Sequence, residues 1–305
     1  MPARSARPPR RPAGPAPRTA ADAPTVSRRH QAGAESARGL LFTVLGELVL
    51  PSGEPAWTSA FIDVLGRLGV EEKASRQALM RTAADGWLTS ERVGRRTRWT
   101  LSRNAESLLT EGAARIYGFQ GMQREWDGRW LLVVARVPES DRSARHLLRT
   151  RLTWAGFGSP APGLWVSTHP DRMEEAERVL GEAGVLGEAQ IFLGEHRGGG
   201  ELSAMVRQAW DLDAIEESYE EFLGAFASRT SRTSRSSRTS RDTVVRLVEL
   251  VHAWRSFPLR DPELPAALLP ARWSGGRAAD RFRRRHGQWA ADGRAEWGRI
   301  TGSAG

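Results

Sequence analysis

Between residues 38 and 116 the apolar positions follow first a helical period and then an alternating one. The helical period predicts a first helix that ends at Pro51 and a second helix in SAFIDVLGRLGV, capped by Thr58 or Ser59. A third helix is predicted over residues 71–85, and Gly86 is suited to close it.

The alternating pattern predicts two short strands, 87–93 and 97–101, joined by a turn at Gly94-Arg95-Arg96. Another helix is expected from 103 to about 116. Three helices followed by a hairpin indicate a winged helix-turn-helix domain, which we place at residues 37–118.

Residues 119–200 alternate between strand and helix. Strands are predicted at 130–137, 164–170 and 189–195, and helices at 144–157 and 171–183. This alternation in a short segment indicates a small α/β sandwich, and we expect a ferredoxin-like central domain.

Residues 201–298 return to a helical period and predict a helical C-terminal domain. An acidic helix pair at 201–227 has on its buried side Trp210, Leu212, Ile215, Tyr219, Phe222 and Phe226. The repeat SRTSRTSRSSRTSR at 228–241 suits neither helix burial nor strand alternation, so we expect a disordered insertion. The Arg/Pro-rich tail at 1–36 is also expected to be disordered, and the chain to fray after about Gly298. The fold class predicted is therefore α+β with several domains.

The composition limits the classes of function that the chain can have. There is no cysteine among the 305 residues, which excludes a disulfide framework, a thiol nucleophile and a cysteine-ligated metal. No apolar run approaches the roughly 18 to 20 residues of a membrane span. No hydrophobic segment follows the arginines of the N-terminal tail, so we expect a cytoplasmic protein.

The net charge of +9 is concentrated in two segments. The first 38 residues carry +6 and residues 228–241 carry +5, which leaves −2 for the remainder. Overall basicity is therefore weak support for a nucleic-acid partner. Within the remainder, however, residues 73–103 carry eight basic and two acidic side chains.

That local charge coincides with the elements that bind DNA in winged helix-turn-helix domains, where the third helix enters the major groove and the wing follows the backbone. The residues expected to contact DNA are Lys73, Ser75, Arg76, Gln77, Arg81, Arg95, Arg96 and Arg98. Two alternatives are a solvated surface in an arginine-biased proteome, since only Lys73 of the basic residues is a lysine, and a domain that contacts protein instead of DNA.

Signatures of an enzyme are weak. The six histidines show neither HxxxH nor HxxH spacing, and the glycines at 198–200 lack the lysine of a phosphate loop. Carboxylate pairs such as Glu174 and Glu175 are interpreted as solvated helix faces. His252 and Arg255, beside Trp254, favour a structural polar cluster over a catalytic one. We expect no enzyme activity, no cofactor and no metal site.

Five segments in a fixed order carry a resemblance to a known family. They are RGLLFTVLGE, SRQALMRTAADGWL with the wing VGRRTRW, GRWLLVVARVPES, GFGSPAPGLWVSTHP and HAWRSFPLRDPELPAALLPARWSGGRA. Over about residues 37–298 the chain resembles the PaaX family of bacterial transcriptional repressors, named for the regulator of phenylacetate degradation. The last segment, at 252–278, is the most specific of the five.

The resemblance implies a dimeric repressor of a catabolic operon, bound to double-stranded operator DNA and released by an acyl-CoA thioester such as phenylacetyl-CoA. Candidates to bind this anionic effector are Arg142, Arg145, Arg149, Arg151, His252, Arg255, Arg260 and Asp261. The alternative is that they are surface arginines and a structural Asp-Pro turn.

The central domain is also similar to the small ferredoxin-like nucleases of CRISPR adaptation, which carry a metal-binding aspartate at the end of the first strand. Here that strand runs into Arg136, and an arginine cannot ligate a metal. A metal-dependent nuclease is therefore disfavoured and stays as the alternative enzyme class. Pairing of two such domains is expected to form the dimer.

Overall fold

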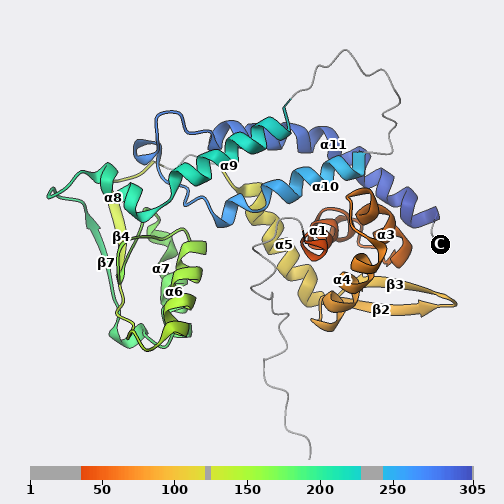
Figure 1. Ribbon diagram of the computed structural model, residues 1–305, viewed down its shortest axis with the longest axis horizontal. Coiled ribbons are helices and arrows are strands. Elements are labelled where there is room, and N and C mark those ends of the chain that lie inside the picture. The colour runs from red at the N-terminus through yellow and green to blue at the C-terminus, as the bar shows by residue number, and fades with distance from the viewer. Residues whose placement is uncertain (1–35, 121–124, 228–242, 304–305) are drawn as a thin grey trace, which may run out of the picture.

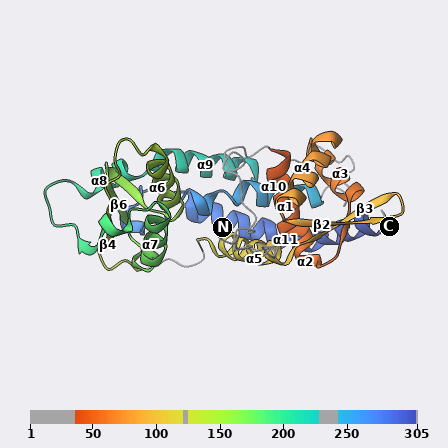
Figure 2. The same cartoon turned by 90° about the horizontal axis from the view of Figure 1, so that it is seen from below.

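The computed structural model describes residues 36–120, 125–227 and 243–303. The predictions for the tail before Ser36 and for the insertion at 228–241 therefore lie outside the described residues. The molecule is elongated (Figure 1 and Figure 2), with the N-terminal part and the central sheet domain at opposite ends, and the C-terminal helices extend from the middle of the molecule along the N-terminal part.

The first predicted helix ends at Ser52, one residue after the predicted end at Pro51. α1 (Ala37–Val44) continues through a π-helical turn (Leu45–Val49) into the short α2 (Leu50–Ser52). The π-helical turn directly precedes Pro51, which has no N–H to donate to the preceding turn. The chain then turns at Gly53, which has a φ of 65°.

Two further predicted helices are confirmed as α3 (Thr58–Arg67) and α4 (Glu72–Ala84). The predicted capping of α3 by Thr58 or Ser59 is wrong, because no side chain caps this helix. The hydroxyl of Thr58 instead accepts a hydrogen bond of 2.8 Å from the indole N–H of Trp99. This bond ties the start of α3 to the adjacent sheet.

The N-terminal sheet is antiparallel and has the order β1-β3-β2. Its strands are β1 (Ala56–Trp57), β2 (Leu88–Val93) and β3 (Arg96–Leu101). Gly94 turns the hairpin between β2 and β3 with a φ of 60°, a conformation that suits glycine. α5 (Arg103–Gly118) follows and leads towards the middle of the molecule.

The central part contains a four-stranded antiparallel sheet of the order β5-β6-β4-β7. Its elements are β4 (Arg129–Val134), α6 (Arg142–Trp154), β5 (Gly158–Ala161), β6 (Leu164–Ser167), α7 (Met173–Glu182) and β7 (Gln190–Glu195). This chain order agrees with the ferredoxin-like prediction. β5 was not predicted, because GSPA shows no apolar alternation; it forms by pairing with β6.

Both faces of this sheet carry hydrophobic side chains. Leu131 and Val133 of β4 belong to a core that also contains buried residues of α6 and α7. On the other face α8 (Leu202–Ala209) packs against β5, and Trp210 lies so close to Gly158 that a Cβ there would be 2.5 Å from the indole ring. α8 thus packs on the sheet, although the predicted boundary at residue 201 placed it in the C-terminal domain.

The C-terminal helices pack on the N-terminal part as well as on one another. They are α9 (Leu212–Ala225), α10 (Thr243–Trp254) and α11 (Gly275–Ser303). One continuous hydrophobic core includes Leu41 and Phe61 from the N-terminal part and Trp254 and Phe282 from the C-terminal helices. α11 is helical through residue 303, so the predicted fraying after Gly298 is wrong.

Candidate nucleic-acid interface

α4 has a buried and an exposed face, which the helical period separates. Ser75, Ala78, Leu79 and Thr82 face the core. The opposite face exposes Lys73, Arg76, Gln77, Met80, Arg81 and Ala84. The structure therefore brings four of the predicted DNA contacts, Lys73, Arg76, Gln77 and Arg81, together on one exposed surface.

Ser75 is a correction to the predicted set of contacts. Its side chain is fully buried, and its hydroxyl donates a 3.1 Å hydrogen bond to the carbonyl oxygen of Glu71 one turn earlier. A buried hydroxyl that bonds to its own helix is not available to a base edge. The prediction assigned every residue in the first turn of the helix to the DNA contacts, whereas the helical period places Ser75 on the buried face.

Met80 is a candidate contact that the sequence analysis missed. It lies on the exposed face of α4 and is 62% exposed, which is unusual for a large apolar side chain. The signal was present in the sequence, because Met80 follows Arg76 and Gln77 by four and three positions and so shares their face. An exposed apolar group among cations and an amide suits a surface that meets both phosphates and base edges.

Arg76 forms an ion pair with Glu72 on the first turn of α4. The guanidinium and carboxylate atoms are 2.8 Å apart, and both side chains are more than half exposed. Such exposed pairs contribute little to stability, on the order of 0 to 1 kcal/mol. Arg76 can therefore exchange this partner for a phosphate or a base at little cost.

The three arginines predicted on a wing lie differently on the β2–β3 hairpin. Arg95 and Arg96 are exposed at the end of the hairpin, next to Gly94. Arg98 lies opposite Glu91 in the register of β2 and β3 and forms an ion pair of 2.7 Å with it across the strands. Arg95 and Arg96 are therefore better placed than Arg98 to contact a ligand.

α4 is fixed to α1 by an ion pair and by aromatic packing. Arg38 of α1 is buried and donates a hydrogen bond to Asp85, the residue that follows α4. The ring of Phe42 meets that of Trp87 edge to face, with centroids 4.7 Å apart. These contacts hold the exposed face of α4 in one orientation.

The arginines predicted to bind an effector lie on two different domains. On α6, Ala144, Leu148 and Leu152 face the sheet, and the exposed side carries Arg142, Arg145 and Arg149. The guanidinium of Arg145 donates to the carbonyl of Glu139, and that of Arg151 stacks over the ring of Trp154.

His252 and Arg255 lie instead on and just beyond the end of α10, where it meets α1. Nδ1 of His252 is 2.9 Å from Oγ1 of Thr43. The side chains of His252 and Arg255 both lie close to Gly39, where an added Cβ would be 3.4 Å from His252 and 3.3 Å from Arg255. Burial lowers the pKa of Arg255. This pair joins two helices, which fits the structural interpretation given above.

Asp261 is also held from several sides. Its carboxylate accepts hydrogen bonds from the hydroxyl of Tyr219 (2.6 Å), the side-chain amide of Gln120 (3.1 Å) and the backbone amide of Glu263 (2.7 Å). Burial raises the pKa of Asp261 above the ordinary value. These bonds favour a structural Asp-Pro turn, whereas Arg260 is exposed.

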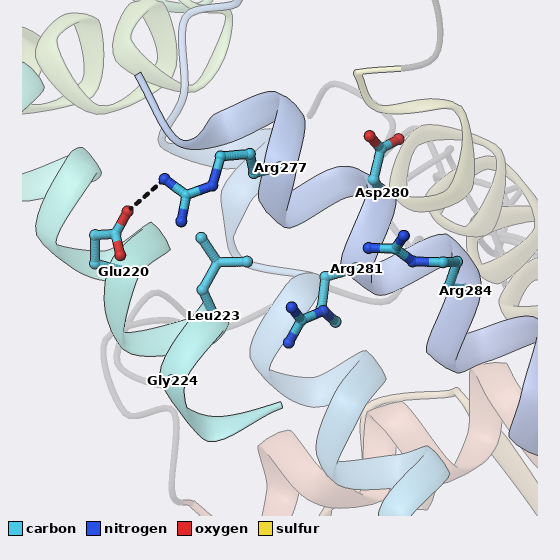
Figure 3. Close-up of a pocket in the computed structure, with 7 residues that line it drawn as sticks. All are labelled: Glu220, Leu223, Gly224, Arg277, Asp280, Arg281 and Arg284. Carbon is cyan, nitrogen blue, oxygen red and sulfur yellow. Dashed lines mark hydrogen bonds and ion pairs between the residues drawn. The ribbon is translucent and has the colours of Figure 1, made fainter. Parts of the chain in front are cut away.

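A cleft between α9 and α11 gathers arginines that the sequence analysis did not single out (Figure 3). Arg277, Arg281 and Arg284 line it from α11, and its volume is about 390 Å³. Arg277 lies 3.3 Å from the carboxylate of Glu220, and Arg281 donates to the carbonyl oxygen of Phe226 (2.8 Å). The spacing of these arginines, at i, i+4 and i+7, was the signal available in the sequence.

A buried carboxylate connects the N-terminal part with α5 and α11. Glu47, in the π-helical turn, accepts hydrogen bonds from the hydroxyl of Tyr117, from Arg294 (2.8 Å) and from the ring of His286 (3.1 Å). Burial alone would raise the pKa of Glu47, but the hydrogen bonds from His286 and Tyr117 and the charge of Arg294 lower it below the ordinary value. This cluster fixes α11 against the helices of the N-terminal part.

Within the described residues, no group of three or more histidine, aspartate or glutamate side chains is arranged to hold a metal ion. Arg136 follows β4 and is exposed. No helix in that same part of the chain is long and apolar enough to cross a membrane.

The sequence was compared with models of protein families and with known proteins. Three family models match consecutive segments: "PaaX-like protein" at residues 36–105, "PaaX protein central Cas2-like domain" at 123–206 and "PaaX-like protein C-terminal domain" at 210–298. The chain is 32% identical over 247 residues to "Transcriptional repressor PaaX" of Escherichia coli (strain K12), which covers 79% of this chain and 76% of the relative.

A solved structure, "Uncharacterized protein Rv0674 from Mycobacterium tuberculosis", has a TM-score of 0.55 and 21% sequence identity, and the match covers 87% of this chain and 99% of that one. It supports the fold alone. The curated relative and the family models identify the chain as a transcriptional regulator, a class without enzymatic activity. The chain belongs to the PaaX family.

Proposed function

We propose that residues 37–118 form a winged helix-turn-helix domain that binds operator DNA and represses transcription. The observation that carries this proposal is the exposed face of α4, where Lys73, Arg76, Gln77 and Arg81 lie together opposite a fully packed inner face. As a regulator of transcription, the protein is expected to act in the cytoplasm.

The geometry of α4 suits the major groove. Its 13 residues span about 20 Å at 1.5 Å per residue, and the groove, about 12 Å wide, admits one helix. Gln77 can pair with an adenine edge and Arg76 or Arg81 with a guanine edge. Met80 offers an apolar contact to a thymine methyl group. Arg95 and Arg96 of the wing would meet phosphates or the minor groove.

The proposal includes a two-fold dimer formed through the sheet domain. β7 is an edge strand of the sheet, and it exposes Phe192 (53%) and Leu193 (44%). An exposed apolar edge strand is prone to pair with another strand, and a second copy of β7 can pair with it antiparallel. A two-fold dimer predicts a palindromic operator with half-sites one or more helical turns apart.

The proposed effector is an acyl-CoA thioester of the phenylacetyl-CoA type. Arg142, Arg145 and Arg149 form an exposed cationic side of α6 that suits the phosphates of CoA. His252 and Arg255 remain candidates for the polar part of the same site. Preferential binding to a conformation in which the two DNA-binding domains no longer match the operator spacing would release the DNA.

Substitutions on α4 test this proposal. We expect Q77A and R81A each to weaken operator binding by about 1 to 3 kcal/mol, with a smaller loss on scrambled DNA, because base contacts specify the sequence. R207A, an exposed arginine of α8, is the matched control and should bind as the wild type does. Unchanged operator affinity in Q77A and R81A would instead favour a protein-contact domain. Cleavage of DNA in the presence of magnesium would favour the nuclease alternative.

A further inference from the structure

The last turn of α11 lies beside the wing, although the two are about 200 residues apart in the sequence (Figure 2). Between them is an open groove of about 1070 Å³. Its walls are the start of α3, the first turn of α4, the end of the hairpin and the last two turns of α11. Its basic lining residues are Arg67, Arg76, Arg95, Arg96 and Arg299.

The end of α11 is held firmly against the N-terminal part. Glu296 is buried, and its carboxylate accepts one hydrogen bond from Arg67 of α3 (2.8 Å) and another from the backbone amide of Val244 (3.2 Å). The rings of Trp297 and Phe61 meet edge to face, 5.5 Å apart, and Trp297 is only 2% exposed. The wall of the groove formed by α11 is therefore a fixed part of the structure.

The groove has an excess of positive charge. Five arginines and three acidic residues line it. The lining residues therefore carry a net charge of +2, and this charge favours an anionic ligand.

We propose that this groove binds a segment of the DNA backbone and that Arg299, from the C-terminal helix, contacts one of its phosphates. The inference rests on the proposed function. The groove is continuous with the proposed DNA surface, because Arg76 belongs to the exposed face of α4 and Arg95 and Arg96 belong to the wing.

The proposal has a structural consequence. The C-terminal helix does not only support the DNA-binding domain but forms part of the surface that meets DNA. Glu296 and Trp297 hold Arg299 in place, so a change in the packing of α11 on α3 would change a DNA contact directly.

The salt dependence of DNA binding tests the proposal. Each phosphate contact contributes about 0.9 to the slope of log affinity against log salt. For the full chain carrying R299A we expect this slope to fall by about 0.9, which corresponds to about eightfold weaker binding at 0.1 M salt. The loss should be equal on operator and scrambled DNA, because a phosphate contact carries no sequence information. R284A, an exposed arginine earlier on the same helix, is the matched control and should leave the slope unchanged.

The outcomes separate this inference from the proposed function. Specific operator binding by the wild type together with an unchanged slope in R299A would overturn the inference and leave the proposed function intact. A change in release by phenylacetyl-CoA with unchanged DNA affinity would assign the groove to the phosphates of the effector and would also overturn it. If the wild type shows no preference for the operator, the proposed function and the inference both fail.

Discussion

Met80 lies in the middle of the exposed face of α4, with Arg76 and Gln77 one turn before it and Arg81 beside it. If α4 enters the major groove, the thioether side chain faces the edges of base pairs. The apolar group at those edges is the methyl group of thymine. We therefore expect Met80 to contact one thymine of each half-site.

The contact can be removed by a change in the protein or by a change in the DNA. The substitution M80A shortens the side chain, and deoxyuridine in place of one thymine removes only the methyl group of that base. Burial of a group of this size is worth about 0.8 kcal/mol. At about 1.4 kcal/mol for each tenfold change in affinity, the methyl group accounts for about a fourfold difference. Because Met80 is 62% exposed in the free protein, the substitution should not disturb the core.

The assay is a double-mutant cycle by fluorescence anisotropy. Each thymine of the operator is replaced in turn, and the affinities of the wild type and M80A are compared. We expect one position per half-site at which deoxyuridine costs the wild type about fourfold and costs M80A nothing. L186A, which removes a similarly exposed apolar side chain (45%) from the sheet domain, is the control. Equal losses in wild type and M80A at every position would refute the contact.

Three further predictions concern stability, assembly and the effector. E47Q should lower the free energy of unfolding by about 3 kcal/mol, measured by urea titration, because it removes the buried carboxylate that pairs with His286 and Arg294. Since the folded-state pKa of Glu47 is lowered, its contribution is complete above the ordinary value of 4.5 and is lost as the pH falls through the folded pKa, so the gap between E47Q and wild type should narrow below pH 4.5. F192D should convert the dimer to monomer in sedimentation velocity, and an unchanged dimer would exclude the edge of β7. Alanine substitution of Arg142, Arg145 and Arg149 together should weaken the release of DNA by phenylacetyl-CoA. It should leave operator binding unchanged.

The elements that are governed by local sequence could be predicted. The helical period gave α3, α4 and α5 because each buries one stripe of side chains, and Gly94 marked the hairpin because its turn needs a positive φ. The same period would have excluded Ser75 and included Met80, had it been applied to each residue of α4. β5 could not be predicted, since it is a strand only through its pairing with β6.

The contacts that join distant segments had no local signal. Glu47 pairs with His286, and Arg67 pairs with Glu296, at sequence separations of 239 and 229 residues. Neither pair belongs to a motif, and the sequence around each acidic residue indicates only a helix. The groove beside the wing depends on these contacts, so only the structure brings Arg299 near the proposed DNA surface.

The most direct test of the central claim is the binding of the purified wild-type protein to DNA from upstream of its own gene. Fluorescence anisotropy at two salt concentrations, with scrambled DNA of the same composition as competitor, measures affinity and specificity together. A DNA-reading α4 predicts binding to the upstream DNA at least about a thousandfold tighter than to scrambled DNA, with a clear preference at both salt concentrations. Equal binding to both DNAs that disappears at the higher salt would show that only non-specific phosphate contacts operate, and would contradict the account.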